Sequence, residues 1–254
     1  MTSSVGLVIP AYSPDVDRLY EYVTALLERI EPETIRIEWD APRPGAPDKL
    51  SDRPVSINTV PGRRGKGAAL TAGFEALDAD VLAFADADGS TPAREMAAVI
   101  EPVAAGEADL AAGSRRHPDA EVATHQTRSR RFLGDGFAWL ARRLLTVDLY
   151  DYQCGAKAIS AEGWLQVREH LYESGFAWDV ELIAMAGALG LRVGEVPVQW
   201  YDRPGSTVSP LKASLELGGA LVTSRHRAKQ LRNSRLHTAI AKRREESPPL
   251  VEDR

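Results

Sequence analysis

The chain has few of the residues that cross-link proteins or bind soft metal ions. Its 254 residues include one cysteine, Cys154, so no disulfide can form within the chain, and a reducing compartment suits it. Cysteines and histidines do not cluster at the spacing of a zinc site. The sequence therefore offers oxygen ligands, and not zinc ligands, to a metal ion.

Long apolar runs and an excess of positive charge are also missing. No run reaches the ~18 apolar residues of a membrane-spanning helix, and the first apolar stretch, VGLVIP, is too short for a secretory signal. The net charge of -5 argues against general nucleic-acid binding. We therefore expect a cytoplasmic protein, either free or peripheral at the cytoplasmic face of a membrane, with no nucleic-acid partner.

The sequence does contain a regular alternation of apolar strands and amphipathic helices. With 44% apolar residues the chain can bury a substantial core. The first strand is expected to stop at Pro10. This order predicts an α/β fold with a mostly parallel, Rossmann-like, doubly wound sheet flanked by helices. The predicted strands are residues 5–9, 34–39, 55–60, 80–85 and 109–113, and the predicted helices are 15–30, 68–77 and 93–104.

The second half of the chain is less regular. It contains a predicted helix at 130–145, helices near 161–171 and 178–189, and strands at 153–160 and 192–200. Sheets of this kind bind ligands outside the carboxyl ends of their strands. The loops expected at that edge begin at Pro10, Asp40, Pro61 and Asp86.

The stretch FADADGSTPA places two aspartates, Asp86 and Asp88, where a buried strand meets a turn. Paired carboxylates repel each other unless a cation lies beside them, and Mg²⁺ or Mn²⁺ binds through one or two carboxylates plus substrate phosphates. The alternative is that both are turn and cap residues, with Ser90 or Thr91 at the start of a helix. Asp-x-Asp alone is too common to decide between these interpretations.

A basic, glycine-rich loop, PGRRGKG, lies on the same predicted edge. Its glycines allow close approach to a ligand, and Arg63, Arg64 and Lys66 add positive charge at a helix start that would suit a phosphate. The spacing is not that of a P-loop. A solvated basic loop is the alternative, but the acidic pair and this loop together indicate a bound diphosphate.

At this point a family resemblance appears. The segments VIPAY, GKGAAL, DADGS, AGSR, DYQCGAKAIS, FAWDVEL and EVPVQWYDRPGSTVS occur in this order, together with a strand-ending aspartate near residue 40. Over roughly residues 5–210 the sequence resembles the inverting family 2 glycosyltransferases of the GT-A fold. Within that family it is most similar to polyprenyl-phosphate sugar synthases, including dolichyl-phosphate glucosyltransferase and dolichyl-phosphate mannose synthase.

The resemblance implies a role for each matching position. Asp86 and Asp88 correspond to the metal and diphosphate motif that holds Mg²⁺ or Mn²⁺, and Ser90 can also line the metal. Asp179 and Glu181 correspond to an acidic acceptor-side motif. The substrate-binding positions are Pro10, Ala11 and Tyr12 for the nucleotide, Asp40 for the nucleobase, Arg115 and Arg130 for the acceptor phosphate, Gln153 and Gly155 for the donor sugar, and Arg203 and Ser206 in a loop that closes over the diphosphate.

The implied reaction is inverting transfer of a hexose from a nucleotide-diphosphate sugar to a polyprenyl or dolichyl phosphate. The segment QCG favours UDP-glucose, with GDP-mannose next. Because a lipid phosphate is already anionic, no strong base is needed, whereas a hydroxyl acceptor would require Asp179 or Glu181 as the base. The alternatives are a family 2 enzyme acting on a saccharide or other hydroxyl, and an inactive sugar-nucleotide-binding protein.

Several positions depart from the family pattern. EWDAPRPG replaces the usual aspartate pair with Gly-Ser after the second strand, Gly134 stands where mannose-type relatives have serine, and Thr207 replaces a common lysine. These departures bear mainly on the identity of the donor.

The C-terminal region is basic. Residues 225–244 carry eight lysines and arginines and no acidic residue, so this helix could lie on an anionic membrane surface, or it could be solvated or packed on a partner subunit. We expect a GT-A glycosyltransferase domain over residues 1–208, a basic amphipathic helical region over 209–237 and a disordered tail over 238–254.

Overall fold

The computed structural model describes residues 3–120, 128–201, 210–232 and 248–252, without the side chains of 128–133 and 210–216. Within these residues a seven-stranded sheet has the order β3-β2-β1-β4-β6-β5-β7. The predicted mostly parallel sheet with flanking helices is confirmed. The strands are β1 (Val5–Tyr12), β2 (Thr34–Asp40), β3 (Val55–Val60), β4 (Val81–Ala85), β5 (Leu110–Ser114), β6 (Ala156–Ser160) and β7 (Val193–Pro197).

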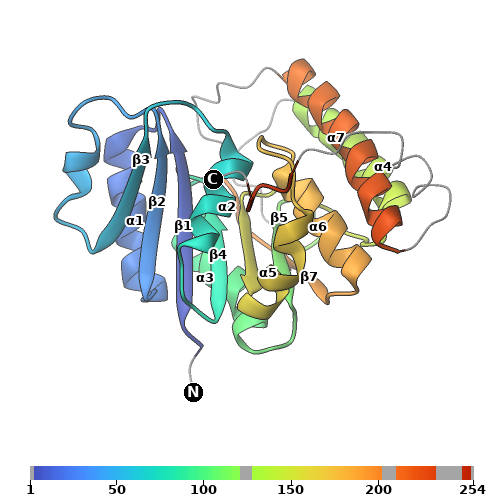
Figure 1. The fold of residues 1–254 in the computed structure, drawn as a ribbon, viewed down its shortest axis with the longest axis horizontal. Helices are drawn as coiled ribbons and strands as arrows, with labels where there is room; N and C mark the ends of the chain where they lie inside the picture. The colour runs from blue at the N-terminus through green and yellow to red at the C-terminus, as the bar shows by residue number, and fades with distance from the viewer. Residues whose placement is uncertain (1–2, 121–127, 202–209, 233–247, 253–254) are drawn as a thin grey trace.

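Helices cover both faces of this sheet (Figure 1). One core cluster joins the sheet to α1 and α3, and a second joins it to α2, α5 and α6. The apolar faces of these helices are therefore buried against the two opposite faces of the sheet. The helices are α1 (Val16–Ile30), α2 (Lys66–Glu75), α3 (Ala93–Ala104), α4 (Arg128–Leu144), α5 (Ala161–Val167), α6 (Trp178–Leu189) and α7 (Pro210–Leu231), with short 3-10 helices η1 (Pro47–Leu50) and η2 (Arg168–His170).

Strand β1 runs through Pro10, and the prediction that it stops there is wrong. Its pairing with β4 ends at Val8, whereas its pairing with β2 continues to Tyr12. Pro10 therefore lies where β1 has a neighbour on one side only, and the missing N–H of proline is tolerated at such an edge. As a result β1 carries residues 10–12 farther toward the ligand-binding edge.

Strand β6 runs antiparallel to both of its neighbours, β4 and β5. Ala156, its first residue, pairs with Ala85, the last residue of β4. The chain just before β6, Gln153 to Gly155, therefore lies at the carboxyl end of β4, beside Asp86. This reversal brings together two motifs that are far apart in the sequence.

Helices α4 and α7 lie side by side at one end of the molecule (Figure 1). The Arg225 side chain of α7 donates a hydrogen bond of 3.0 Å to the carbonyl of Leu144 at the end of α4. No helix of the described residues is both long and apolar enough to span a bilayer.

Part of the expected disordered tail contacts the core. In the described segment 248–252 the Leu250 N–H donates a 2.8 Å hydrogen bond to the carbonyl of Leu171, and the Leu250 side chain packs against the second core cluster.

Candidate active site

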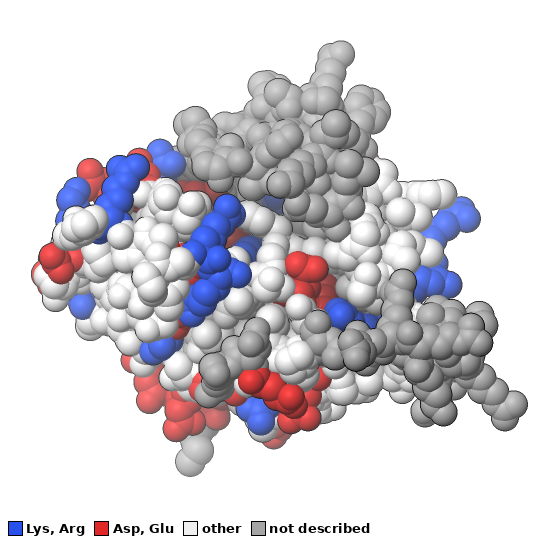
Figure 2. Space-filling view, turned by 45° about the horizontal axis from the view of Figure 1, so that its top comes forward, with Lys and Arg blue, Asp and Glu red and all other residues white. Residues whose placement is uncertain are grey.

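The acidic pair, the basic loop and the start of α6 meet at the carboxyl edge of the sheet. Strand β1 points upward in Figure 1, and Figure 2 turns this upper edge toward the viewer, where acidic and basic side chains lie next to each other. Asp86 follows β4, Lys66 begins α2, and Asp179 lies in the first turn of α6. The structure therefore brings these three predicted residues together.

Asp86 is held against the chain before β6. Its N–H donates to the carbonyl of Gly155 at 3.0 Å. A Cβ added to Gly155 would lie 1.8 Å from the Asp86 carboxylate, so only glycine leaves room for this acid. The side chain is 40% exposed, with solvent on one side and protein on the other. Burial raises the pKa of Asp86 above its ordinary value, Lys66 opposes the shift, and Asp88 and Asp179 add to it.

Asp88 and Ser90 form the turn that follows. Asp88 is exposed, and its Oδ1 accepts a 2.9 Å hydrogen bond from the N–H of Ser90. Gly89 has a φ of 64°, which suits glycine, and Tyr22 packs against it. The predicted turn is therefore present, but neither Ser90 nor Thr91 caps α3, whose N-cap is Pro92 with no side-chain hydrogen bond.

The residues of this turn fit a divalent cation. The hydroxyl of Ser90 is buried and has no hydrogen-bond partner among the described residues, and it follows two carboxylates that face an open edge. Hard oxygen donors of this kind suit Mg²⁺ or Mn²⁺, which takes its other ligands from substrate phosphates and water. No group of three or more histidine, cysteine or acidic side chains within the described part of the chain is placed to hold a metal by itself. A metal ion at this turn would therefore need further ligands from a substrate or water, and the metal role of these residues stays a prediction.

Lys66 joins the acidic pair to helix α6. Its Nζ lies 2.9 Å from Asp86 Oδ1 and 2.9 Å from Asp179 Oδ2. Only 8% of the Lys66 side chain is exposed. Burial lowers the pKa of Lys66, but the charges of Asp179 and Asp86 outweigh this effect, so the pKa lies above its ordinary value. Lys66 is a permanent cation between two carboxylates.

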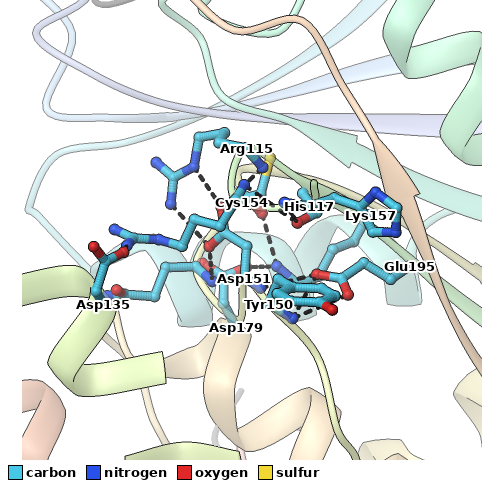
Figure 3. Close-up of polar contacts among 12 residues, drawn as sticks. Arg115, His117, Asp135, Tyr150, Asp151, Cys154, Lys157, Asp179 and Glu195 are labelled. Carbon is cyan, nitrogen blue, oxygen red and sulfur yellow. Dashed lines mark hydrogen bonds and ion pairs between the residues drawn. The ribbon is translucent and has the colours of Figure 1, made fainter. Parts of the chain in front are cut away.

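A second buried lysine, Lys157 of β6, completes the charge balance around Asp179. Its Nζ lies 3.3 Å from Asp179 Oδ1 and donates a 2.7 Å hydrogen bond to the carbonyl of Cys154 (Figure 3). Lys157 is 1% exposed, and Asp179 is 2% exposed. Asp179 is therefore held between two ammonium groups, and these contacts fix the position of its carboxylate.

Glu181 faces another part of the molecule. Its carboxylate accepts the N–H groups of Tyr172 and Glu173 at 2.8 and 2.7 Å, and it pairs with Arg227 of α7 at 2.5 Å. Burial raises the pKa of Glu181, and these donors oppose the shift. The structure does not bring Glu181 to the acidic pair, so its predicted acceptor-side role stays a prediction while its contacts tie α7 to the loop before α6.

The start of α2 is closed by the loop before α6. The N–H groups of Gly67 and Ala68 donate to the carbonyls of Gly175 and Ser174, each at 3.2 Å. A Cβ at Gly67 would lie 2.1 Å from the carbonyl oxygen of Glu173. Tertiary packing therefore supplies acceptors for these two N–H groups, and phosphate binding at this helix start stays a prediction.

Asp40 anchors the basic loop. Its carboxylate accepts hydrogen bonds from the Arg64 N–H at 2.7 Å, the Arg64 side chain at 2.8 Å and the Gly65 N–H at 3.1 Å. Asp40 is only 2% exposed. Recognition of a nucleobase by Asp40 stays a prediction, and its visible role is to fix the loop that carries Lys66.

At the end of β1, where a nucleotide-binding loop was predicted, Tyr12 is 45% exposed, and the Arg63 guanidinium lies 4.3 Å from its ring centre. Pro10 and Ala11 remain in β1. This stacked pair forms an exposed aromatic and basic surface, and its predicted contact with a nucleotide stays a prediction.

Arg115 is paired with an acid that sequence analysis did not single out. Its guanidinium contacts both oxygens of Asp151, at 2.6 and 3.0 Å (Figure 3). Burial raises the pKa of Asp151, but Arg115 outweighs it and lowers that pKa to about 2. Burial also raises the pKa of the neighbouring Cys154 thiol to about 11. A phosphate contact by Arg115 would have to use the donors that face away from Asp151.

The loop before β6 is held by two acids, the buried Asp151 and the partly exposed Glu195. Asp151 also accepts the Gln153 N–H at 3.0 Å, and Glu195 of β7 accepts the N–H groups of Tyr150 and Asp151 at 2.8 and 2.9 Å. These contacts place Gln153 and Gly155 next to Asp86. The sequence offered one sign of these buried polar contacts, which is the charged residue Lys157 inside an otherwise apolar strand.

Three predicted residues lie outside what the structure describes. These are Arg203, Ser206 and the side chain of Arg130.

Fold and site together define an α/β protein in which carboxylates paired with lysines lie at one edge of the sheet. Sheets of this kind bind nucleotides at that edge. Residues 7–163 match the family described as Glycosyl transferase family 2, and because this is more than half of the chain, the protein belongs to that family. The predicted family is thereby confirmed.

The chain is also similar in sequence to several named proteins. Glycosyltransferase AglD of Haloferax volcanii is 31% identical over 228 residues, covering 86% of this chain and 36% of that protein. Dolichyl-phosphate beta-glucosyltransferase of Mus musculus is 31% identical over 188 residues, covering 70% of this chain and 57% of that protein. The chain thus spans about a third to just over half of the length of these two relatives. Undecaprenyl-phosphate mannosyltransferase of Micrococcus luteus is 28% identical, covering 77% of this chain and 83% of that protein.

Solved structures share the fold. Glucosyl-3-phosphoglycerate synthase from Mycobacterium tuberculosis, in complex with Mn²⁺, UDP-glucose and phosphoglyceric acid, has a TM-score of 0.68 and 14% identity, covering 88% of this chain and 80% of that one. Mannosyl-3-phosphoglycerate synthase from Rubrobacter xylanophilus has a TM-score of 0.67 and 15% identity, covering 91% of this chain and 75% of that one. At such identities the likeness shows the fold alone, and it confirms the predicted GT-A fold.

Proposed function

We propose that this protein transfers a hexose, with inversion, from a nucleotide-diphosphate sugar to a polyprenyl or dolichyl phosphate. The observation that carries the proposal is the pair Asp86 and Asp88 at the carboxyl end of β4. Beside it lie the cation of Lys66 and the hydroxyl of Ser90, which has no partner in the described part of the chain. The names of the relatives, which include a dolichyl-phosphate glucosyltransferase and an undecaprenyl-phosphate mannosyltransferase, support the acceptor class. UDP-glucose is the favoured donor and GDP-mannose the next.

Mg²⁺ or Mn²⁺ would be held by Asp88, Asp86 and Ser90, and it would offset the charge of the donor diphosphate. The protein's own residues supply the rest. Tyr12 and Arg63 offer a stacking surface to the nucleotide, and Gly155 leaves the space that keeps Asp86 at the strand end.

The surroundings of Asp179 support an acceptor that needs no base. A general base works best when it is free to take a proton. Asp179 is instead clamped by Lys66 and Lys157, and Glu181 accepts three hydrogen bonds from protein groups. A lipid phosphate, which is already anionic, suits this arrangement better than a hydroxyl acceptor does.

The direct test is an assay of the purified chain with UDP-glucose or GDP-mannose, a polyprenyl phosphate and Mg²⁺ or Mn²⁺. We expect a glycolipid product that requires the metal, formed faster from UDP-glucose. Product formed only with a hydroxyl acceptor would contradict the proposed acceptor. Donor binding without turnover over a panel of polyprenyl phosphates would point to an inactive binding protein.

We further propose that the chain works peripherally at the cytoplasmic face of a membrane. Trp139 of α4 and Val222 of α7 are 52% and 60% exposed, and the Arg143 guanidinium lies 4.7 Å from the Trp139 ring centre. Exposed aromatic and aliphatic side chains next to arginines suit an anionic bilayer surface. In this proposal α4 adds to the membrane-binding surface that was expected of the basic C-terminal helix.

Co-sedimentation with anionic liposomes tests the membrane proposal. The double substitution Trp139→Ala and Val222→Ser should lower the bound fraction. Leu165→Ala is the matched control, because Leu165 is 58% exposed on α5, which Figure 1 shows away from the α4 and α7 pair. Equal binding by all three proteins would contradict attachment through this surface.

A further inference from the structure

Lys66 contacts two carboxylates that belong to different parts of the site. The Asp86 side chain is 40% exposed and faces the open edge, whereas Asp179 is buried and also pairs with Lys157. Both contacts of Lys66 Nζ measure 2.9 Å. The ammonium group therefore lies against the oxygen of Asp86 that a divalent cation would seek.

The charges around Lys66 are nearly balanced. The carboxylates of Asp86 and Asp179 pair with the ammonium groups of Lys66 and Lys157, and the nearby Asp88 adds a carboxylate without such a pair among the described residues, which leaves one negative charge. A dication added beside Asp86 and Asp88 would make the cluster positive in a partly buried place. Like charges a few ångströms apart repel strongly there, because screening by water is incomplete. A diphosphate brought at the same time would restore the balance.

We infer that Lys66 competes with the divalent cation for Asp86, so that the cation binds tightly only together with the donor diphosphate. The inference rests on the proposed function and deepens it by making the binding of metal and nucleotide cooperative. Such coupling is reciprocal, so the metal strengthens nucleotide binding by the same factor.

The surroundings of Lys66 allow it to release Asp86 without leaving its place. Asp179 keeps the second contact, and the Nζ lies 5.0 Å from the ring centre of Phe84 and 5.9 Å from that of Phe176. These partners hold the side chain near the site. The ammonium group can thus turn from Asp86 toward an arriving phosphate at little conformational cost.

Titration calorimetry of Mn²⁺ binding, with and without saturating UDP, tests this inference on the full chain without using activity. For the wild type we expect UDP to raise the Mn²⁺ affinity by about tenfold or more, the usual range of a coupling between sites. Lys66→Met should bind Mn²⁺ alone more tightly, so that UDP adds much less. Lys66→Arg keeps the charge and should keep the coupling.

Three controls make the outcome decisive. Lys49→Met removes an exposed lysine that pairs with Asp17, and it should behave like wild type. Circular dichroism melting reports whether Lys66→Met folds, and the double variant Lys66→Met with Asp179→Asn removes the charge left unpaired if the single variant does not fold. Unchanged coupling, or weaker binding of Mn²⁺ alone, in the folded variants overturns the inference. Absence of Mn²⁺ binding by the wild type even with UDP would instead overturn the proposed metal site itself, and the inference with it.

Discussion

The carboxylate of Asp86 occupies the space that a side chain at Gly155 would take, and the Asp86 N–H donates to the carbonyl of Gly155 at 3.0 Å. Two motifs that lie far apart in the sequence are therefore complementary in shape. The antiparallel direction of β6 is the reason, since it starts where β4 ends.

Gly155→Ala should displace Asp86 and lower transfer activity by roughly one to two orders of magnitude, because small misplacements of reacting groups are costly. The matched control is Gly218→Ala in α7, where an added Cβ meets nothing within 4 Å. Steady-state rates of both variants at saturating metal provide the measurement. Wild-type activity in Gly155→Ala would show that the position of Asp86 is not critical.

Asp88→Ala should abolish metal-dependent transfer while leaving the fold intact. Asp88 is exposed, so its removal costs little stability, whereas the loss of a metal-binding carboxylate removes electrostatic stabilisation worth about 10²-fold or more in rate. Rates with Mn²⁺ and thermal melting curves are compared with those of Asp119→Ala, whose side chain is 80% exposed. Full activity of Asp88→Ala would remove its metal role.

The buried pair of Arg115 and Asp151 should contribute to the acid sensitivity of the fold. Because Arg115 lowers the pKa of Asp151 to about 2, the folded state favours the ionised acid, and its stabilisation is complete above the unfolded value of about 4. It is lost as the pH falls from about 4 to about 2, and it amounts to about 2 kcal/mol at neutral pH. Urea unfolding of the wild type across this range should show the decline.

Asp151→Asn should lower the free energy of unfolding at neutral pH by about 3 to 5 kcal/mol, because it leaves the Arg115 cation buried without its counter-charge. Asp109→Asn is the comparison, since its partner Arg192 is 58% exposed, and an exposed pair contributes about 1 kcal/mol or less. Equal losses in the two variants would mean that burial does not set the strength of the Arg115 pair.

Glu181→Gln should reduce stability more than catalysis. The Glu181 carboxylate is 1% exposed and accepts two N–H groups and Arg227, so replacing it weakens charged hydrogen bonds worth about 1 to 3 kcal/mol. Chemical unfolding and the rate of the folded variant are measured together. A large loss of rate with unchanged stability would return Glu181 to the role of a base.

A variant that ends at residue 247 should loosen the loop before α6. It lacks the Leu250 N–H that donates to the Leu171 carbonyl and the apolar contact of Leu250 with the core. Amide hydrogen exchange should become faster at residues 171–175 and stay unchanged in β2, which is far from this contact. Unchanged exchange in the loop would mean that the segment 248–252 does not hold it.

The sequence predicted elements well where apolar periodicity was strong, and it placed Asp86, Asp88 and Lys66 at one edge. It missed Asp151, Lys157 and Glu195 because their partners are distant in sequence. Asp151 and Lys157 pair with charged side chains, and Glu195 accepts backbone N–H groups. The sequence likewise did not reveal that two N–H groups at the helix start, those of Gly67 and Ala68, have acceptors in a distant segment. Nothing in GKGAAL shows that the carbonyls of Ser174 and Gly175 lie against it.

By itself, the sequence determined the alternation of strands and helices, because apolar periodicity is a local property. That alternation indicated which residues lie at the ligand-binding edge, where the carboxyl ends of parallel strands meet. Only the tertiary structure decided which charges meet: that Lys66 bridges Asp86 and Asp179, that Asp40 holds the basic loop and that Glu181 faces α7. Pairing of charges depends on distances between segments far apart in the chain, and those distances exist only after the helices pack on the sheet.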